Sequence, residues 1–215
     1  MIPLRDESRR PAGFPLITAL IIAINALVFV LELAGGEAFV TRWSVVPADI
    51  IGGHHWVTIL TAMFMHASWS HILGNMVFLW AFGPEIEEAM TAPRYVLFYL
   101  LGGFVAMVAQ IAASPTSTVP CLGASGAIAA VMGAFIVTFP HDNIRTLLVF
   151  GWFVRITAVP AVLLIGLWFL VQLLSVGTVA DVQSGGVAYM AHIAGMIFGA
   201  VTARLFEPSG RLAER

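Results

Sequence analysis

Charge is scarce in this chain of 215 residues: charged side chains make up 10% of it, hydrophobic ones make up 60%, and lysine is absent. A soluble domain carries about 25% charged residues, so this chain lacks the polar groups to cover a globular surface. A net charge of −2 without a basic cluster argues against nucleic-acid binding. The single cysteine, Cys121, excludes an intramolecular disulfide and a cysteine-rich metal site. The composition therefore predicts an all-α, polytopic membrane protein, because helices satisfy their own backbone in lipid.

Six apolar stretches are long enough to cross a bilayer, whose hydrocarbon core of about 30 Å needs roughly 20 helical residues. Glycine and proline, which interrupt helices, mark most of their ends. We expect six transmembrane helices within residues 16–34, 58–82, 95–113, 123–139, 156–176 and 187–206. They form one membrane domain over residues 15–206, between short tails of residues 1–14 and 207–215.

The arginine positions orient these helices, because cytoplasmic loops are enriched in positive charge. Nine of the ten arginines lie in the two tails, at the end of the sixth helix, or in the loops after the second and fourth helices, and Arg42 is the exception. Both termini are therefore predicted to be cytoplasmic. The loops 35–57, 114–122 and 177–186 are predicted to face outward.

Polar side chains inside the predicted spans are costly in lipid and therefore informative. At about 1.5 Å of rise per residue, Ser125, His192, His71 and Asn75 fall at similar depths, mostly in the outer half of the bilayer. His71 and Asn75 are four residues apart and share a helix face. Glu32 lies near an outer helix end and is interpreted as an interfacial residue.

Small residues surround Ser125 and His192 in the sequence, and such faces let membrane helices approach closely. A Ser–His hydrogen bond needs a separation of about 3 Å, which bulky faces would prevent. This pattern predicts acyl transfer by a dyad, with Ser125 as nucleophile and His192 as general base, since no acidic residue lies at that depth. Asn75 and the free N–H groups of a helix start are suited to hold an oxyanion. The plain alternative is ordinary packing around a structural histidine.

These residues resemble the motifs of the rhomboid family of intramembrane serine proteases, and the resemblance covers nearly the whole chain. Three motifs, His-xxx-Asn, Gly-x-Ser-Gly and Ala-His-xx-Gly-xxx-Gly, are matched in order by His71-Ile72-Leu73-Gly74-Asn75, by Gly123-Ala124-Ser125-Gly126, and by residues 191–199. The resemblance implies a rhomboid-like bundle in which Ser125 attacks the scissile carbonyl and His192 is its base. His71, Asn75 and the Ser125 backbone N–H would line the oxyanion pocket, with Gly123 in support.

The resemblance also implies a cellular setting and partners. It implies an enzyme without cofactor or metal in a bacterial inner membrane, with its active site open to the outer side. The partners would be the lipid bilayer and single-pass transmembrane substrates, cut in or near the outer part of their helix. A gate formed by the fifth helix and the loop 177–186 is implied as well.

Two positions depart from the family pattern. The family often has Trp-Arg in the first outer loop, where this chain has Trp56 followed by Val57. It usually has an aromatic residue four positions after the nucleophile, stacked on the catalytic histidine, where this chain has Ala129. We expect Tyr189 to replace that aromatic ring.

Several interpretations stay open at this stage. His66 is interpreted as a structural hydrogen-bonding residue, and Cys121 as a packing residue, because no basic neighbour would activate its thiol. A catalytically silent relative would bind membrane clients without cutting them. A metalloprotease would draw on histidines such as His54 and His55, but the His-Glu-x-x-His motif is absent. A transporter would need a polar path through the inner half of the membrane, which is apolar here.

Overall fold

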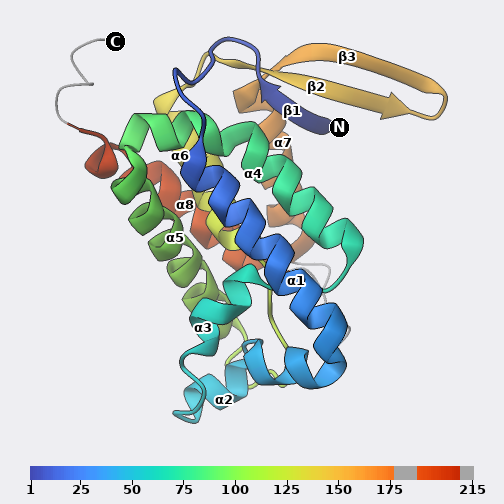
Figure 1. Ribbon diagram of the computed structural model, residues 1–215, viewed down its shortest axis with the longest axis vertical. Helices are drawn as coiled ribbons and strands as arrows, with labels where there is room; N and C mark the ends of the chain where they lie inside the picture. Colours follow the sequence, from blue (N-terminus) through green and yellow to red (C-terminus); the bar gives the residue numbers. More distant parts are fainter. Residues whose placement is uncertain (177–187, 209–215) are drawn as a thin grey trace.

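The computed structural model describes residues 1–176 and 188–208 of the chain, and most of them are helical. The helices are α1 (Leu16–Trp43), α2 (Pro47–Ile51), α3 (Thr58–Thr61), α4 (Trp69–Met90), α5 (Ala92–Ala113), α6 (Ser125–Thr138), α7 (Ala161–Val176) and α8 (Tyr189–Phe206), with a 3-10 turn at Ala62–Phe64. The strands are β1 (Ile2–Asp6), β2 (Asn143–Phe150) and β3 (Phe153–Pro160). The long helices form a bundle in which α6 packs against α4, α5, α7 and α8 (Figure 1).

Three of the described helices, α1, α5 and α8, are long and apolar enough to cross a membrane, and α6 and α7 are shorter apolar helices. The prediction of a largely helical membrane protein is confirmed at this level. The bundle of six membrane-crossing helices stays a prediction.

The second predicted helix, placed within residues 58–82, corresponds to α4, which extends beyond the predicted end. The chain leaves the 3-10 turn after Phe64, and α4 begins at Trp69 and runs through Pro84 to Met90. Ser68 accounts for this start, because its backbone is extended and its hydroxyl accepts a hydrogen bond from the His71 N–H at 3.2 Å. Such a serine cap satisfies one of the free donors of a helix start.

A three-stranded antiparallel sheet of order β1-β2-β3 corrects the all-α prediction. The fifth helix accordingly begins at Ala161, because residues 153–160 form β3 instead of the first turns of a helix. A two-residue turn joins β2 to β3, with Gly151 at φ +60° in its first central position. That positive φ suits a type II′ hairpin turn, where glycine is favoured.

Buried charged groups hold β1 and the following coil against the start of β2. Arg9 donates hydrogen bonds to both carboxylate oxygens of Asp142, and its guanidinium carbon lies 3.9 Å from the ring centre of Phe139. Asp6, Asp142 and Glu85 are buried carboxylates in the same region, and Asp6 accepts a hydrogen bond of 2.7 Å from the Ser8 N–H. Burial, strengthened by a hydrogen bond to Asp142, raises the pKa of Asp6 from its ordinary 3.8 to about 7.

This raised pKa predicts that β1 is held less firmly as the pH rises. The folded state favours the protonated form of Asp6. Protonated Asp6 therefore stabilises the fold fully below about pH 4, and this contribution is lost as the pH rises toward and through about 7. We expect the thermal stability of the purified protein, and the ordering of a spin label on β1, to fall between mildly acidic and mildly alkaline buffer. Asp6→Asn should reduce this pH dependence, whereas Glu7→Gln at the neighbouring exposed carboxylate should retain it. An unchanged pH dependence in Asp6→Asn would contradict this assignment.

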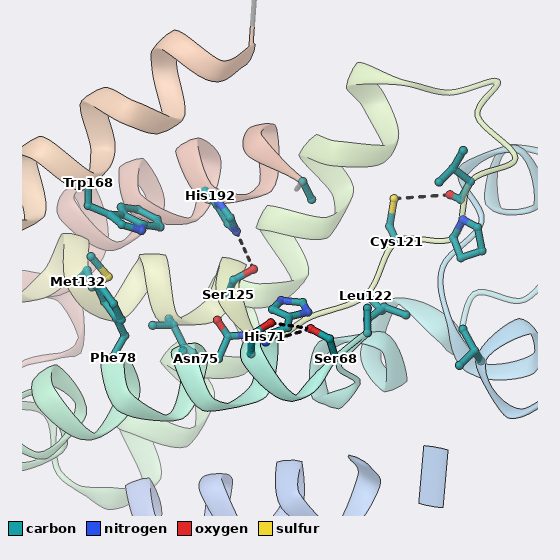
Figure 2. Close-up of a pocket in the computed structure, with 18 of the residues that line it drawn as sticks. Ser68, His71, Asn75, Phe78, Cys121, Leu122, Ser125, Met132, Trp168 and His192 are labelled. Atoms are coloured by element: carbon teal, nitrogen blue, oxygen red, sulfur yellow. Dashed lines mark hydrogen bonds between the residues drawn. The ribbon is translucent and has the colours of Figure 1, made fainter. Parts of the chain in front are cut away.

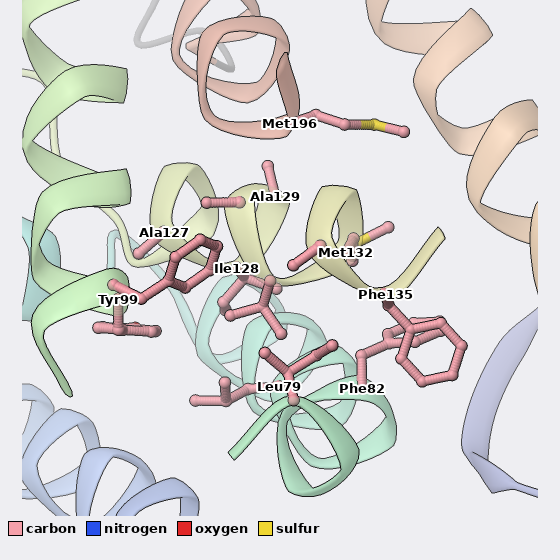
Figure 3. Close-up of a cluster of buried hydrophobic side chains, with 14 of the residues drawn as sticks. Leu79, Phe82, Tyr99, Ala127, Ile128, Ala129, Met132, Phe135 and Met196 are labelled. Carbon is pink, nitrogen blue, oxygen red and sulfur yellow. The ribbon is translucent and has the colours of Figure 1, made fainter. Parts of the chain in front are cut away.

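The hydrophobic core lies around α6, whose side chains are buried almost all round the helix. Figure 3 shows Leu79 and Phe82 of α4, Tyr99 of α5 and Phe135 of α6 converging in this core. A helix that is apolar on every side is suited to a central position with neighbours on all faces. This packing fixes the position of the first turn of α6.

Glycines bring α6 and α8 close together. A Cβ atom placed on Gly195 would lie 2.2 Å from the carbonyl oxygen of Gly126, and one on Gly199 would lie 1.9 Å from that of Ala130. On α6, a Cβ atom on Gly133 would lie 2.1 Å from the Met196 oxygen. The close helix approach predicted from the small residues is confirmed.

Candidate active site

The turn before α6 places Ser125 as the first residue of that helix. Gly123 has φ +137°, a conformation that favours glycine, and its N–H donates to the Ala62 oxygen at 2.8 Å. A Cβ atom at this position would lie 2.9 Å from Cε1 of His71 and 3.6 Å from the Ser125 hydroxyl oxygen. Gly123 therefore leaves the space in which the His71 ring reaches the neighbourhood of Ser125.

Ser125 and His192 are in hydrogen-bonding contact, although they are 67 positions apart in the sequence. The hydroxyl oxygen of Ser125 lies 2.7 Å from Nε2 of His192 (Figure 2). His192 is on the first turn of α8 and is 6% exposed. The structure therefore brings together the two residues that the depth argument paired.

Gln172 of α7 completes a chain of three side chains. Its Oε1 lies 2.7 Å from Nδ1 of His192, and its Nε2 donates to the Trp168 oxygen at 3.3 Å. Because the donation to Trp168 uses the amide nitrogen, the amide oxygen faces the histidine. Nδ1 must then carry the proton, which leaves the lone pair of Nε2 for the Ser125 hydroxyl. The sequence gives no signal for this role of Gln172 beyond a polar residue within an apolar stretch.

Trp168 is the aromatic residue that lies against His192. The two ring centres are 5.4 Å apart with an angle of 42° between the planes. The expectation that Tyr189 would take this place is wrong, since no ring contact joins it to His192 in the part of the chain described. Ala129 is fully buried against neighbouring helices, so the aromatic partner comes from α7. The loop 177–186 of the expected gate lies outside the described residues.

The opposite wall is built from α4 and the segment before it. Nδ2 of Asn75 lies 2.9 Å from the ring nitrogen Nε2 of His66. The backbone N–H of His66 donates to Oε2 of Glu32 at 2.8 Å. His66 is fully buried, and its ring meets that of His71 nearly edge to face at 5.0 Å. These contacts agree with a structural, hydrogen-bonding His66. Glu32 is buried and accepts this backbone hydrogen bond, so it supports the wall from α1, and its position at the membrane interface stays a prediction.

A cavity of about 920 Å³ opens beside these groups. Figure 2 shows the side chains of His71, Asn75, Ser125 and His192 around this space. Its other walls include several apolar side chains: Phe78, Leu122, Met132 and Trp168. The site combines an apolar cavity with a few convergent polar groups, as small-molecule and peptide sites commonly do.

Cys121 lines the same cavity from the loop before α6. Its backbone exchanges two hydrogen bonds with Val45, of 2.7 and 3.0 Å. Burial raises the pKa of its thiol, so the reactive thiolate is disfavoured. Cys121 is thus placed as a packing residue that joins two loops.

The remaining histidine candidates lie apart from this arrangement. His54 and His55 are exposed in the turn between α2 and α3 and do not line the cavity. Among the described residues, no group of three His, Cys, Asp or Glu side chains is placed to hold a metal ion. The geometry therefore groups the Ser125–His192–Gln172 chain with His71 and Asn75 and leaves His54 and His55 outside.

Long apolar helices around a polar site make the chain an integral membrane protein. Residues 53–208 match the Rhomboid domain, and this match covers well over half of the chain. The chain therefore belongs to the rhomboid family.

Individual relatives are distant. The chain is 31% identical to Rhomboid protease GluP of Bacillus subtilis over an aligned segment of 128 residues. This segment makes up 58% of this chain and 25% of the relative. It is 27% identical over 186 residues to Rhomboid protein 1, mitochondrial, of Saccharomyces cerevisiae, covering 83% and 50% of the two chains. It is 32% identical over 130 residues to the Presenilin-associated rhomboid-like protein, mitochondrial, of Rattus norvegicus, covering 58% and 33%. The aligned part thus spans between a quarter and a half of each relative's length.

Proposed function

We propose that the chain is an intramembrane serine endopeptidase that cuts single-pass membrane proteins. The observation that carries this proposal is the 2.7 Å contact between the Ser125 hydroxyl and Nε2 of His192 beside a cavity. A nucleophile within hydrogen-bonding reach of a base that is itself oriented by a third group is the arrangement that activates serine. Membership of a family with relatives named as proteases supports it.

In the proposed reaction, the Ser125 oxygen attacks the scissile carbonyl while Nε2 of His192 takes its proton. The imidazolium that forms keeps its Nδ1–H bond to Oε1 of Gln172, and the same nitrogen Nε2 later gives its proton to the leaving amine. Water then cleaves the acyl-enzyme with His192 again acting as base. The ring face of Trp168, 5.4 Å away, stabilises the positive charge on the histidine.

The oxyanion pocket is proposed to lie between α4 and the start of α6. The first N–H groups of α6 lack partners within the helix and point toward developing negative charge. Asn75 uses one amide hydrogen toward His66, which leaves the other for the oxyanion. His71 is the second side-chain donor, because its ring lies next to Gly123 and Ser125.

The proposal extends to the substrate and to the orientation of the chain in the membrane. A transmembrane helix hides its carbonyl groups in internal hydrogen bonds, so a cleavable segment must unwind before it reaches Ser125. We propose six membrane-crossing helices with both termini in the cytoplasm of a bacterial cell and the site near the outer side of the inner membrane. The arginine distribution supports this orientation.

The test is cleavage of a tagged single-pass protein in proteoliposomes. Wild type is expected to release a fragment whose new end maps within or beside the substrate helix, and a chelator should not change the rate. Ser125→Ala should reconstitute equally well and release none. Cleavage that persists in Ser125→Ala would refute the mechanism. A folded wild type that cuts none of a panel of helices with small, helix-destabilising residues would favour a catalytically silent client-binding protein.

Gln172 offers a separate prediction about how the base is positioned. Gln172→Leu should lower kcat about 10²-fold with little change in KM, because the histidine loses the acceptor that fixes its tautomer and ring position. Gln172→Glu keeps an oxygen acceptor and should recover much of the rate. Ser175→Ala, on the same helix and close to Gln172, is the matched control and should behave as wild type. Equal kcat values for Gln172→Leu and wild type would show that Gln172 plays no positioning role.

A further inference from the structure

The β2–β3 hairpin extends sideways beyond the helices (Figure 1). Near its base, Ile144 and Thr146 are fully buried. Farther out, Val149 is 47% exposed, Val154 61% and Trp152 99%. We call residues 147–156 the distal hairpin; it is ordered as a strand pair but carries exposed apolar side chains.

The distal hairpin is apolar on both faces. Leu147, Leu148 and Val149 follow one another in β2, and successive residues of a strand point to opposite faces. In β3, Ile156 stands opposite Leu147 and Val154 opposite Val149. Arg155 is the one charged residue in residues 147–156. A hairpin that emerged into water would carry polar residues on at least one face.

This apolar ribbon is continuous with the surface that the helices present to lipid. β3 ends at Pro160, and α7 begins at the next residue with Val162, Leu163 and Leu167 exposed. The hairpin therefore leaves the bundle at the level where α7 begins, which is the level of the bilayer interface in the proposed arrangement of membrane-crossing helices. A tryptophan at a hairpin tip and an arginine behind it suit that interface, where aromatic rings and cationic side chains meet lipid headgroups.

We infer that the distal hairpin inserts into the interfacial layer of the leaflet on its own side of the bundle, with Trp152 as its anchor. A bilayer surrounds an inserted ribbon on both faces, whereas a docked protein would cover one face and leave the other in water. The hairpin lies at the end of α6 opposite Ser125, since residue 143 follows the C-terminal end of that helix. The inference is therefore independent of the proposed catalytic activity.

The experiment places an environment-sensitive fluorophore at the tip. Trp152→Cys in a Cys121→Ser background, labelled and reconstituted into phosphatidylcholine–phosphatidylglycerol vesicles, should show blue-shifted emission. Its quenching by spin labels near the carbonyl end of the acyl chains should exceed its quenching by aqueous iodide. Arg10→Cys, exposed in the coil between β1 and α1, is the matched control and should respond mainly to iodide. Val154→Cys provides a second position within the distal hairpin.

The fluorescence results distinguish insertion into lipid from exposure to water and from contact with a second copy. Blue-shifted emission and lipid quenching at both hairpin positions, with an aqueous response at Arg10→Cys, would support insertion. Iodide quenching at the hairpin equal to that at Arg10→Cys would overturn it. Energy transfer between labelled copies that rises with the protein-to-lipid ratio, without lipid quenching, would assign the hairpin to contact with a second copy and would equally overturn it. Activity is not needed to read any of these results.

Discussion

Replacing Gly199 with alanine is expected to lower the cleavage rate about 10²-fold and to destabilise the fold by about 2 kcal/mol. The added Cβ would lie 1.9 Å from the carbonyl oxygen of Ala130 and within 3 Å of two more backbone atoms of that residue. The backbone of Ala130 cannot change its position as a flexible side chain can, so α8 must move away from α6. These two helices carry His192 and Ser125, and their 2.7 Å contact would lengthen with that movement.

The control for this prediction is the same substitution on a helix with room for it. Among the described residues, no atom from another part of the chain would lie within 4 Å of a Cβ atom on Gly166 of α7. Gly166→Ala should therefore leave activity unchanged and should stabilise the helix by up to about 1 kcal/mol, the usual difference between the two residues in helices. Thermal unfolding in detergent and cleavage rates in proteoliposomes measure the two effects. Wild-type behaviour in Gly199→Ala would show that the α6–α8 approach is looser than described.

Removing Ser125 and His192, singly and together, should produce strongly non-additive losses. Each single alanine variant is expected to lower kcat by about 10³-fold or more, because neither nucleophile nor base works without the other. The double variant should lose no more than the larger single loss. Substrate binding should stay near the wild-type level in all three variants, since the change affects the reaction step and leaves the cavity in place.

Additive losses in this cycle would contradict the account, because they would mean that the two residues act independently. A second control is available at His66, the buried histidine that contacts Asn75. His66→Gln should reduce the rate far less than His192→Ala, since Gln keeps a hydrogen-bonding group toward Asn75 while the Ser125–His192 pair is untouched. Full loss of activity in a folded His66→Gln protein would move His66 into the catalytic machinery.

Much of the candidate site could be predicted from the sequence because lipid makes polar side chains conspicuous. Ser125, His192, His71 and Asn75 share a similar depth in the predicted spans, and the structure places all four around one cavity. The role of Gln172 could not be predicted, because it depends on how α7 is rotated against α8 and on the amide donating to the Trp168 oxygen. Sequence spacing within one helix carries no information about either.

The sheet was missed for a different reason. Residues 153–160 are apolar and run directly into α7, and an apolar run by itself does not separate a strand from a helix. The decisive contacts are distant in sequence: Asp6 stands opposite Ile144, and Arg9 pairs with Asp142. The start of α4 at Trp69 likewise depends on the cap at Ser68, which the hydropathy of residues 58–82 does not reveal.

The most direct test of the central claim is to find where a fluorophosphonate probe reacts with the folded protein in a membrane. We expect peptide mass spectrometry to find one adduct, on Ser125, and we expect it to disappear in His192→Ala and after heat denaturation of wild type. Such a result would require a serine activated by that histidine. Labelling at another residue, or undiminished labelling of Ser125 in His192→Ala, would contradict the account.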